Sequence, residues 1–220
     1  MNEILRRIGT IGIVPVVSLP DATRARPLAQ ALVRGNLPVA EVTFRTAAAA
    51  EGIALMKQAE PEMLVGAGTV LTTAQVRAAL DAGAEFIVAP GFDPQVVDYC
   101  LERAVPVMPG VMTASELTQA VLRNLPAVKF FPAEAMGGMK TLKALAGPFP
   151  DVLFMATGGV TAANVGSYLS WNRMLAIGGS WMVAKDLLAE ERYDDVSALA
   201  LQAVCIVAGL KDRSFLLRTA

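Results

Sequence analysis

Two charged side chains stand inside apolar segments of the sequence, where an unpaired charge is costly. Lys129 lies within AVKFFPA (127–133) and Glu41 within VAEVTF (39–44), whereas the other five lysines fall in helical or terminal segments. Burial disfavours the charged form of an amine, and a neutral amine forms Schiff bases with ketones. The competing interpretation of Lys129 is a structural lysine, paired with a carboxylate or reaching the surface. Glu41 is then either a structural partner or an acid–base group.

The composition excludes several other kinds of chemistry. The 220 residues include no histidine, which removes Ser-His-Asp and Cys-His nucleophile systems and most catalytic zinc sites. Any general acid or base must be Glu, Asp, Lys, Tyr or Cys. A net charge of −1, with 18% charged residues, argues against nucleic acid as the main partner. We see no metal-ligand cluster and expect no cofactor, because a protonated imine is itself an electron sink.

Further polar residues follow other apolar runs. Glu41, Thr43 and Arg45 are two residues apart and share one face of a strand. An inward Arg45 suits a carboxylate ligand, since its guanidinium binds both oxygens, while the alternative is an exposed loop arginine. The turns TGG (157–159) and GGS (178–180) could bind phosphate on backbone N–H groups, although each alone is ordinary turn chemistry.

The elements that position these residues follow a regular pattern. Apolar, β-branched runs of the kind found in buried parallel strands alternate with helical segments. Asp21, Thr72, Asp93 and Thr113 are expected to begin four of these helices, and Thr113 has the capping-box spacing to Glu116. The runs occur eight times, at 11–17, 39–44, 63–70, 86–90, 105–111, 127–133, 152–159 and 174–180.

Eight such units predict a (β/α)8 TIM barrel, an α/β fold, formed by one domain over residues 1–220 with a short N-terminal helix. The competing fold is an open doubly wound sheet. That fold would want a G-x-G-x-x-G turn after its first strand, and none follows residues 11–17. In a barrel the site lies at the carboxyl ends of the strands, where the residues named above are found.

The remaining features concern location and assembly. Cys100 and Cys205 form no CxxC pair and are expected to be free, buried thiols in a reducing compartment. The segment 1–17 is interpreted as a helix and a strand rather than a signal peptide, and no 18-residue apolar run occurs. We therefore expect a cytoplasmic protein. A hydrophobic fraction of 54% favours an oligomer, because extra apolar surface usually lies at subunit interfaces.

Several longer motifs, in this order and over nearly the whole chain, resemble those of the class I 2-keto-3-deoxy-6-phosphogluconate (KDPG) aldolases. The resemblance implies a homotrimeric (β/α)8 barrel that cleaves KDPG to pyruvate and glyceraldehyde 3-phosphate, in the Entner–Doudoroff pathway. Some family members also cleave 4-hydroxy-2-oxoglutarate. The motifs are EVTFRT (41–46), VGAGTVL (65–71), PGVMTASE (109–116), VKFFPAE (128–134), GPF (147–149), TGGV (157–160) and GGSW (178–181).

The resemblance also implies roles for individual residues. Lys129 would form the Schiff base and Glu41 would be the general acid/base. Arg45 and Thr69 would hold the carboxylate of the pyruvyl half, Phe131 would form its wall, and Pro90 and Thr157 would line the site. The substrate phosphate would be bound by Gly158, Gly159, Gly178, Gly179 and Ser180. Two departures are visible: Ala156 stands where the family usually has proline, and Asn36 where many members have glycine. Neither removes a residue to which a role is assigned.

Two other functions remain open on the sequence. A barrel with apolar helices could serve as an assembly scaffold, natural or engineered, in which catalysis is incidental. A phosphate-binding barrel isomerase is the third candidate, and it would not need the lysine of the sixth strand.

Overall fold

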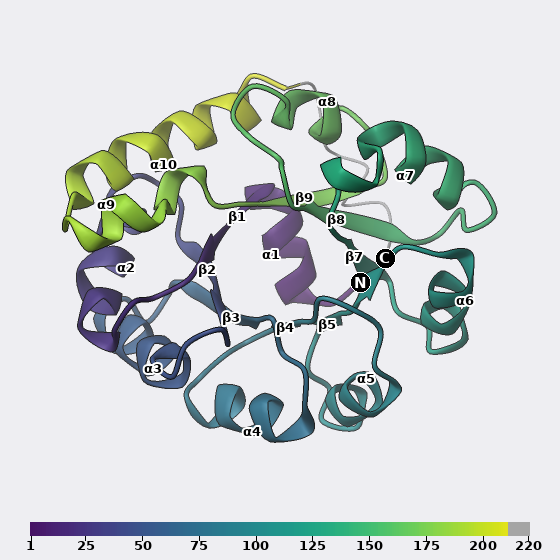
Figure 1. The fold of residues 1–220 in the computed structure, drawn as a ribbon, viewed down its shortest axis with the longest axis horizontal. Coiled ribbons are helices and arrows are strands. Elements are labelled where there is room, and N and C mark those ends of the chain that lie inside the picture. Colours follow the sequence, from purple (N-terminus) through teal and green to yellow (C-terminus); the bar gives the residue numbers. More distant parts are fainter. Residues whose placement is uncertain (211–220) are drawn as a thin grey trace.

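A computed structural model describes residues 1–210 and shows parallel strands arranged as a barrel inside a ring of helices (Figure 1). The predicted (β/α)8 fold is confirmed, while the last ten residues of the expected domain, 211–220, lie outside the described part. Hydrogen-bonded neighbours follow the order β5-β4-β3-β2-β1-β9-β8-β7-β6. The strands are β1 (Ile13–Val17), β2 (Val39–Thr43), β3 (Leu64–Gly68), β4 (Ile87–Val88), β5 (Val107–Met108), β6 (Gly110–Val111), β7 (Ala127–Phe130), β8 (Leu153–Thr157) and β9 (Met174–Gly179).

The fifth predicted strand is the one that differs from expectation. It is split at Pro109 into β5 and β6, of which β5 pairs with β4 and β6 pairs with β7. Proline has no N–H to donate and so interrupts the ladder at this point. Because the two halves follow each other directly in the chain, they join the two ends of the sheet and close the barrel. The other seven predicted runs each form one strand, with ends a few residues inside the predicted ones.

Helices alternate with the strands, and three of the four predicted starts are confirmed. Thr72 and Asp93 accept backbone N–H groups of the first turn, and Thr113 and Glu116 form a capping box. Asp21 instead caps a short 3-10 helix, Ala22–Arg24, which precedes the α-helix. The helices are α1 (Glu3–Ile11), α2 (Ala25–Arg34), α3 (Ala49–Ala59), α4 (Thr73–Asp81), α5 (Pro94–Leu101), α6 (Ala114–Leu122), α7 (Gly138–Ala146), α8 (Val165–Leu169), α9 (Lys185–Ala189) and α10 (Tyr193–Ala208).

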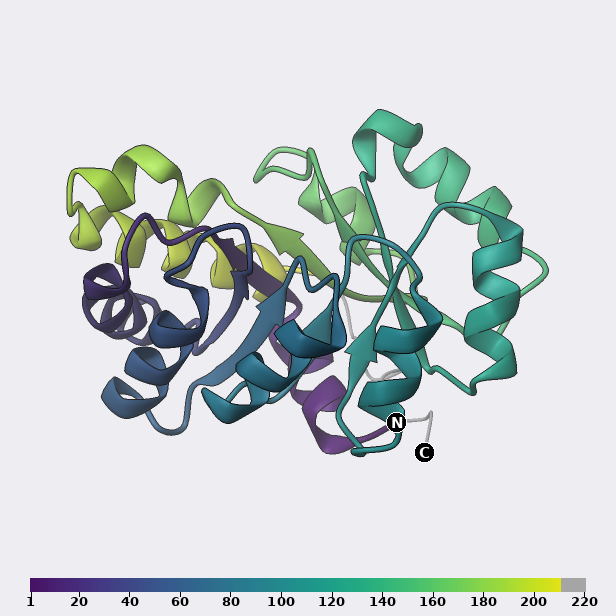
Figure 2. The same cartoon turned by 60° about the horizontal axis from the view of Figure 1, so that its bottom comes forward.

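The two ends of the barrel are built differently. Helix α1 leads directly into β1, so it lies at the amino ends of the parallel strands, and Figures 1 and 2 show it across that end of the ring. Its residues Leu5 and Ile8 are buried in the core. At the carboxyl ends no such helix crosses the strands in these views, and the loops that leave them surround the site.

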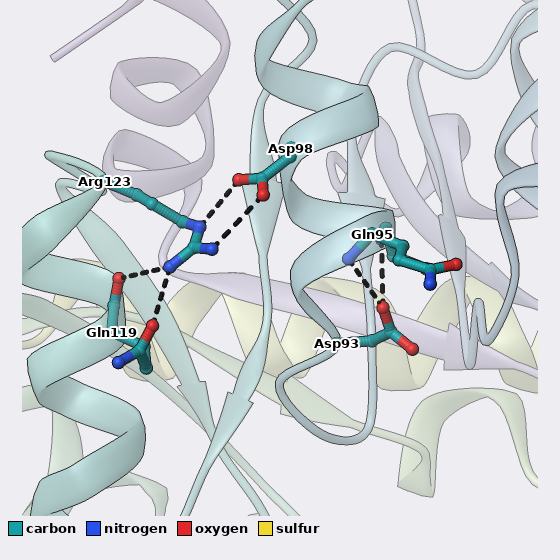
Figure 3. Close-up of polar contacts among 6 residues, drawn as sticks. Asp93, Gln95, Asp98, Gln119 and Arg123 are labelled. Atoms are coloured by element: carbon teal, nitrogen blue, oxygen red, sulfur yellow. Dashed lines mark hydrogen bonds and ion pairs between the residues drawn. The ribbon is translucent and has the colours of Figure 1, made fainter.

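Outer helices are fixed to one another by polar side chains as well as by packing. Figure 3 shows Arg123, at the end of α6, donating to both carboxylate oxygens of Asp98 on α5, at 2.6 and 3.2 Å. The same guanidinium donates to Gln119 one turn earlier in α6. Asp93 caps the start of α5, where its carboxylate accepts the Gln95 N–H. These contacts orient the two helices that flank the split strand.

The barrel interior is defined by the register of its strands. In β1, β2 and β3, Val16 pairs with Glu41 and Glu41 with Gly66, and paired residues of neighbouring strands point to the same side of a sheet. On the opposite side of the ring, Gly110 pairs with Lys129 and Lys129 with Met155. Glu41 and Lys129 therefore both point into the barrel.

The two cysteines differ from the expectation that both are buried. Cys100 is buried, and burial raises the pKa of its thiol to about 12. Cys205 is exposed on α10, because this helix buries only one face, at Val196, Ala200 and Ala203. Both thiols are free. Among residues 1–210, no helix is long and apolar enough to cross a lipid bilayer.

Candidate active site

A lysine–glutamate pair occupies the barrel interior. Lys129 in β7 donates to Glu41 Oε1 in β2, with 3.3 Å between Nζ and the oxygen, and the two side chains are 4% and 0% exposed. No second acceptor for Lys129 Nζ and no donor for Glu41 Oε2 is found in the described part of the chain. Buried polar groups normally satisfy their hydrogen-bonding capacity. This pair therefore keeps one acceptor, and N–H donors, for a ligand.

Missing side chains make room for polar groups of the interior. A Cβ at Gly68 of β3 would overlap the carboxylate of Glu41, and one at Gly178 of β9 would overlap the hydroxyl of Thr157. Both glycines point into the barrel at its carboxyl end. The sequence motifs VGAGTV and GGS thus include glycines whose absent side chains leave space for polar groups.

All four buried polar side chains of residues 1–210 gather in this part of the interior: Glu41, Thr43, Lys129 and Thr157. Thr43 donates to the Val17 carbonyl at 2.9 Å, so its hydroxyl is held by the neighbouring strand. The Thr157 hydroxyl has no partner in that part of the chain. No three His, Cys, Asp or Glu side chains of the same residues group as a metal site would require.

A cavity of about 540 Å³ opens above the pair. Thr43 and Phe131 line it, at the carboxyl end of β2 and directly after β7, each two residues beyond a member of the pair, so the pair lies one layer deeper. The ring of Phe131 has its centroid 5.1 Å from Lys129 Nζ. The remaining lining residues are Val16, Val17, Ser18, Arg45, Thr157, Gly158, Gly159, Val160, Gly178, Ser180, Trp181, Val183, Ala184 and Lys185.

The turn after β8 forms one wall of the cavity. Gly158 and Gly159 have φ values of 100° and 80°, a region that residues with a Cβ rarely adopt. A Cβ at Gly159 would also overlap the side chain of Glu134. The turn is fixed from behind, because Ala133 N–H donates to the Thr157 carbonyl at 2.8 Å and Glu134 N–H to the Gly158 carbonyl at 3.0 Å.

Comparison with known proteins assigns this barrel to a family. The family model for KDPG and KHG aldolases matches residues 3–199. A 2-dehydro-3-deoxy-phosphogluconate aldolase of Treponema pallidum is 44% identical over 207 residues, which cover 94% of this chain and 99% of the relative. The chain belongs to the KDPG and KHG aldolase family. It is thereby an enzyme of the carbon–carbon lyase class.

Solved structures of this aldolase family share the fold. A KDPG aldolase of Zymomonas mobilis, solved with 3-phosphoglycerate, is 36% identical, with a TM-score of 0.86, covering 96% of this chain and 100% of that one. The KDPG aldolase of Legionella pneumophila is 33% identical, with a TM-score of 0.88, covering 92% and 98% of the two chains. The latter holds pyruvate captured at low pH as a covalent carbinolamine intermediate.

Most of the residues named from the sequence lie at the aldolase cavity. Arg45, Phe131, Thr157, Gly158, Gly159, Gly178 and Ser180 line it, with Glu41 and Lys129 beneath them. Thr69, Pro90 and Gly179 do not line it. Thr69 follows β3 in the left-handed region, with φ 54°, and Pro90 follows β4 with its carbonyl against Gly110. Arg45 is exposed at the mouth of the cavity, because β2 ends two residues earlier at Thr43.

The family motifs did not reveal every lining residue. Ser18 follows β1, and the rule that barrel sites lie at carboxyl strand ends would have found it. Lys185 begins α9, and no local sequence signal marks it. Tyr168 lies behind the cavity and donates to the Glu134 carboxylate, and burial together with this carboxylate raises the pKa of its phenol. Nothing in the sequence around this tyrosine predicts its contact with Glu134.

Proposed function

We propose that this chain is a class I aldolase that cleaves KDPG to pyruvate and glyceraldehyde 3-phosphate through a Schiff base on Lys129. The observation that carries the proposal is the 3.3 Å contact between Lys129 Nζ and Glu41 Oε1 inside the barrel, one layer below a cavity. A nucleophile and a base within hydrogen-bond reach are the minimum that imine chemistry requires. Pocket volumes of about 300–1,000 Å³ are usual for small ligands, so a six-carbon phosphorylated acid fits this cavity.

The first half of the reaction forms the imine. Glu41 takes a proton from Lys129, and the neutral amine then adds to the C2 carbonyl of the substrate. A proton passes from nitrogen to oxygen, which gives a carbinolamine. Glu41 returns its proton to the C2 hydroxyl, water leaves, and a protonated Schiff base remains. The free lone pairs of the buried Glu41 carboxylate support its part in both transfers.

The second half of the reaction breaks the C3–C4 bond and then protonates C3. Glu41 removes the proton of the C4 hydroxyl, the C3–C4 bond breaks, and its electron pair neutralises the iminium to give an enamine. Glyceraldehyde 3-phosphate leaves at this stage. Glu41 then gives its proton to C3 of the enamine, and water hydrolyses the resulting imine to free pyruvate and Lys129. One carboxylate serves each step because every transfer takes place beside Lys129 Nζ.

The remaining residues take binding roles in this proposal. Arg45 and Thr69 hold the carboxylate of the pyruvyl half, Phe131 and Pro90 form its walls, and Thr157 completes the site. Gly158, Gly159, Gly178, Gly179 and Ser180 bind the phosphate. Support comes from the cavity, which seven of these residues line, and from the unpartnered hydroxyl of Thr157. The family description also names KHG, which is 2-keto-4-hydroxyglutarate, another name for 4-hydroxy-2-oxoglutarate. This compound is therefore a proposed second substrate.

Trapping with borohydride tests the proposal. The protein is incubated with pyruvate and sodium borohydride, digested, and mapped by mass spectrometry. We expect one reduced pyruvyl adduct, on Lys129, in the wild type and in Lys140→Ala, which removes an exposed lysine of α7. Lys129→Ala should form none. An adduct on another lysine, or none in a folded sample, would contradict the Schiff-base mechanism.

We also infer a homotrimer that functions in the cytoplasm. Leu101 of α5 and Val121 and Leu122 of α6 are 41%, 46% and 68% exposed, on neighbouring helices, which supports a covered surface in an assembly. Size-exclusion chromatography with light scattering measures the mass directly. Three times the 23.1 kDa of one chain supports the trimer, while a much larger closed particle supports the scaffold alternative.

A further inference from the structure

The charge around the cavity has one sign. Among the residues that line it, the charged side chains are Arg45 and Lys185, and no carboxylate is present. Two acidic groups beside the cavity are already engaged: Glu41 lies deeper and accepts from Lys129, and Glu134, behind Gly159, accepts from Tyr168. A cavity with positive walls favours an anionic ligand.

Neither of these two cations has an ionic partner in the structure of residues 1–210. Other arginines of the same part are paired, such as Arg123 with Asp98 and Arg192 with Asp195. Arg45 and Lys185 make no ion pair and no side-chain hydrogen bond there. Their charges remain available to a ligand in the cavity.

The two cations stand apart along the cavity wall. Arg45 follows β2, whereas Lys185 begins α9, at the end of the loop that leaves β9. Strand β1 separates β2 from β9 in the sheet. The loop after β9 also supplies Ser180, Trp181, Val183 and Ala184 to the lining. Lys185 is thus on the side of the glycine turns, and Arg45 is on the other side of β1.

This separation matches a ligand that is anionic at both ends. The substrate of the proposed reaction has a carboxylate at C1 and a phosphate at C6. A carboxylate suits the planar fork of arginine, and a lysine binds phosphate as a compact point charge. With the carboxylate toward Arg45 and C2 at Lys129, the phosphate is directed to the side of the glycine turns and Lys185.

We propose that Lys185 binds the substrate phosphate and determines the preference for phosphorylated over unphosphorylated 2-keto-3-deoxy acids. This inference rests on the proposed aldolase function and adds to it a side chain outside the family motifs. The backbone N–H groups of the glycine turns bind an anion but cannot neutralise it, whereas Lys185 supplies a full positive charge. Because Lys185 is exposed, solvent screens the interaction, and its effect is expected to be moderate.

Steady-state kinetics of Lys185→Gln test this inference. The substrates are KDPG and its unphosphorylated analogue, 2-keto-3-deoxygluconate. We expect the KM for KDPG to rise by roughly 2–5-fold, as loss of one screened charge pair implies, while kcat for KDPG changes little. The KM for the unphosphorylated acid should stay the same. Lys185→Arg should restore the KM for KDPG, since it keeps the charge.

A matched control and an independent readout complete the design. Lys140→Gln removes one positive charge from an exposed position on α7, outside the cavity, and measures the effect of net charge alone. The inhibition constant of inorganic phosphate, competing with KDPG, should rise in Lys185→Gln and not in the control. Equal KM changes for both substrates, or equal changes in the control, would overturn the role of Lys185.

The pyruvate–borohydride adduct separates this inference from the proposed function. Pyruvate has no phosphate, so its adduct on Lys129 does not depend on Lys185. An adduct in the wild type and in Lys185→Gln, with an unchanged preference for phosphorylated substrate, would refute the inference and leave the aldolase intact. Absence of the adduct in both proteins would refute the aldolase function itself.

Discussion

Two lysine–glutamate pairs lie at different places in the barrel and have opposite surroundings. Lys57 of α3 contacts Glu85 at 2.8 Å and also donates to the carbonyls of Pro61 and Met63, at 2.7 and 2.9 Å. Its partners precede β3 and β4, at the amino ends of the strands. Lys129 is more deeply buried, yet within residues 1–210 its one hydrogen-bond acceptor is Glu41, at the longer distance of 3.3 Å.

The difference lies in burial and hydrogen bonding, and it separates a structural lysine from the lysine that the proposed mechanism uses. An ammonium group has three N–H donors, and Lys57 has an acceptor for each. It ties α3 to the segments that precede β3 and β4. Lys129 has one acceptor in the described structure and lies below a cavity, so its other N–H donors are available to a ligand. A buried ion pair whose remaining hydrogen-bond donors and acceptors have no partner lowers the stability of the fold, and such pairs are typical of functional sites.

The largest effect that separates the two lysines is on turnover. Lys129→Ala should lower kcat/KM for KDPG by at least about 10⁴-fold, because the covalent intermediate cannot form. Lys57→Ala should leave kcat/KM within about twofold of the wild type, since neither Lys57 nor any of its three hydrogen-bond acceptors lines the cavity. A coupled assay for pyruvate release measures both. Near-wild-type turnover in Lys129→Ala would contradict the assignment of the nucleophile.

The second effect separates the two members of the buried pair. Glu41→Gln should slow turnover by roughly 10²–10⁴-fold, the usual contribution of a general acid–base group, while Schiff-base formation is partly retained. The expected signature is a borohydride-trapped pyruvyl adduct on Lys129 despite slow cleavage. Complete loss of the adduct in a folded variant would instead indicate that Glu41 is needed for imine formation itself.

A smaller effect is expected when the pair is moved without being removed. The Cβ of Gly68→Ala would overlap the Glu41 carboxylate and must displace it from Lys129. Misplacement of a catalytic group by about 1 Å costs roughly 10²-fold, so kcat should fall by about that factor. Gly147→Ala, where a Cβ meets only the Ala144 carbonyl at 3.4 Å, is the matched control and should retain activity.

The smallest effect is on stability and concerns the structural pair. Lys57→Met removes three hydrogen bonds to a half-buried ammonium and should lower the free energy of unfolding by about 1–2 kcal/mol, after allowance for solvent screening. Urea denaturation followed by circular dichroism measures the change. If Lys57→Met were as stable as the wild type, the hydrogen bonds of Lys57 would not distinguish it from Lys129.

Much of the fold was predictable because each element carries its own local signal. Buried parallel strands read as continuous apolar runs, and all eight predicted runs formed strands. Thr72, Asp93 and Thr113 begin helices because a side-chain oxygen accepts a free N–H of the first turn. Asn36, which stands where many family members have glycine, adopts φ 57°, within the left-handed region that asparagine tolerates.

Other features could not be predicted, because they depend on contacts between distant segments. Cys205 is exposed since α10 packs with one face only, against α2, although its sequence is apolar around most of its circumference. The loop after β9 places Lys185 at the cavity, and helix α8 places Tyr168 behind it. The exposure of Arg45 depended on where β2 ends.

The sequence by itself determined the barrel, the family and the identity of the two central residues. These follow from periodic burial and from motifs of several consecutive residues, both of which are local. Only the tertiary structure decided that Glu41 and Lys129, 88 residues apart, meet across the barrel. It also decided that Lys57, chemically the same side chain, is fully hydrogen-bonded while Lys129 is not. The reason is that reactivity depends on which donors and acceptors remain unpaired once the chain is folded.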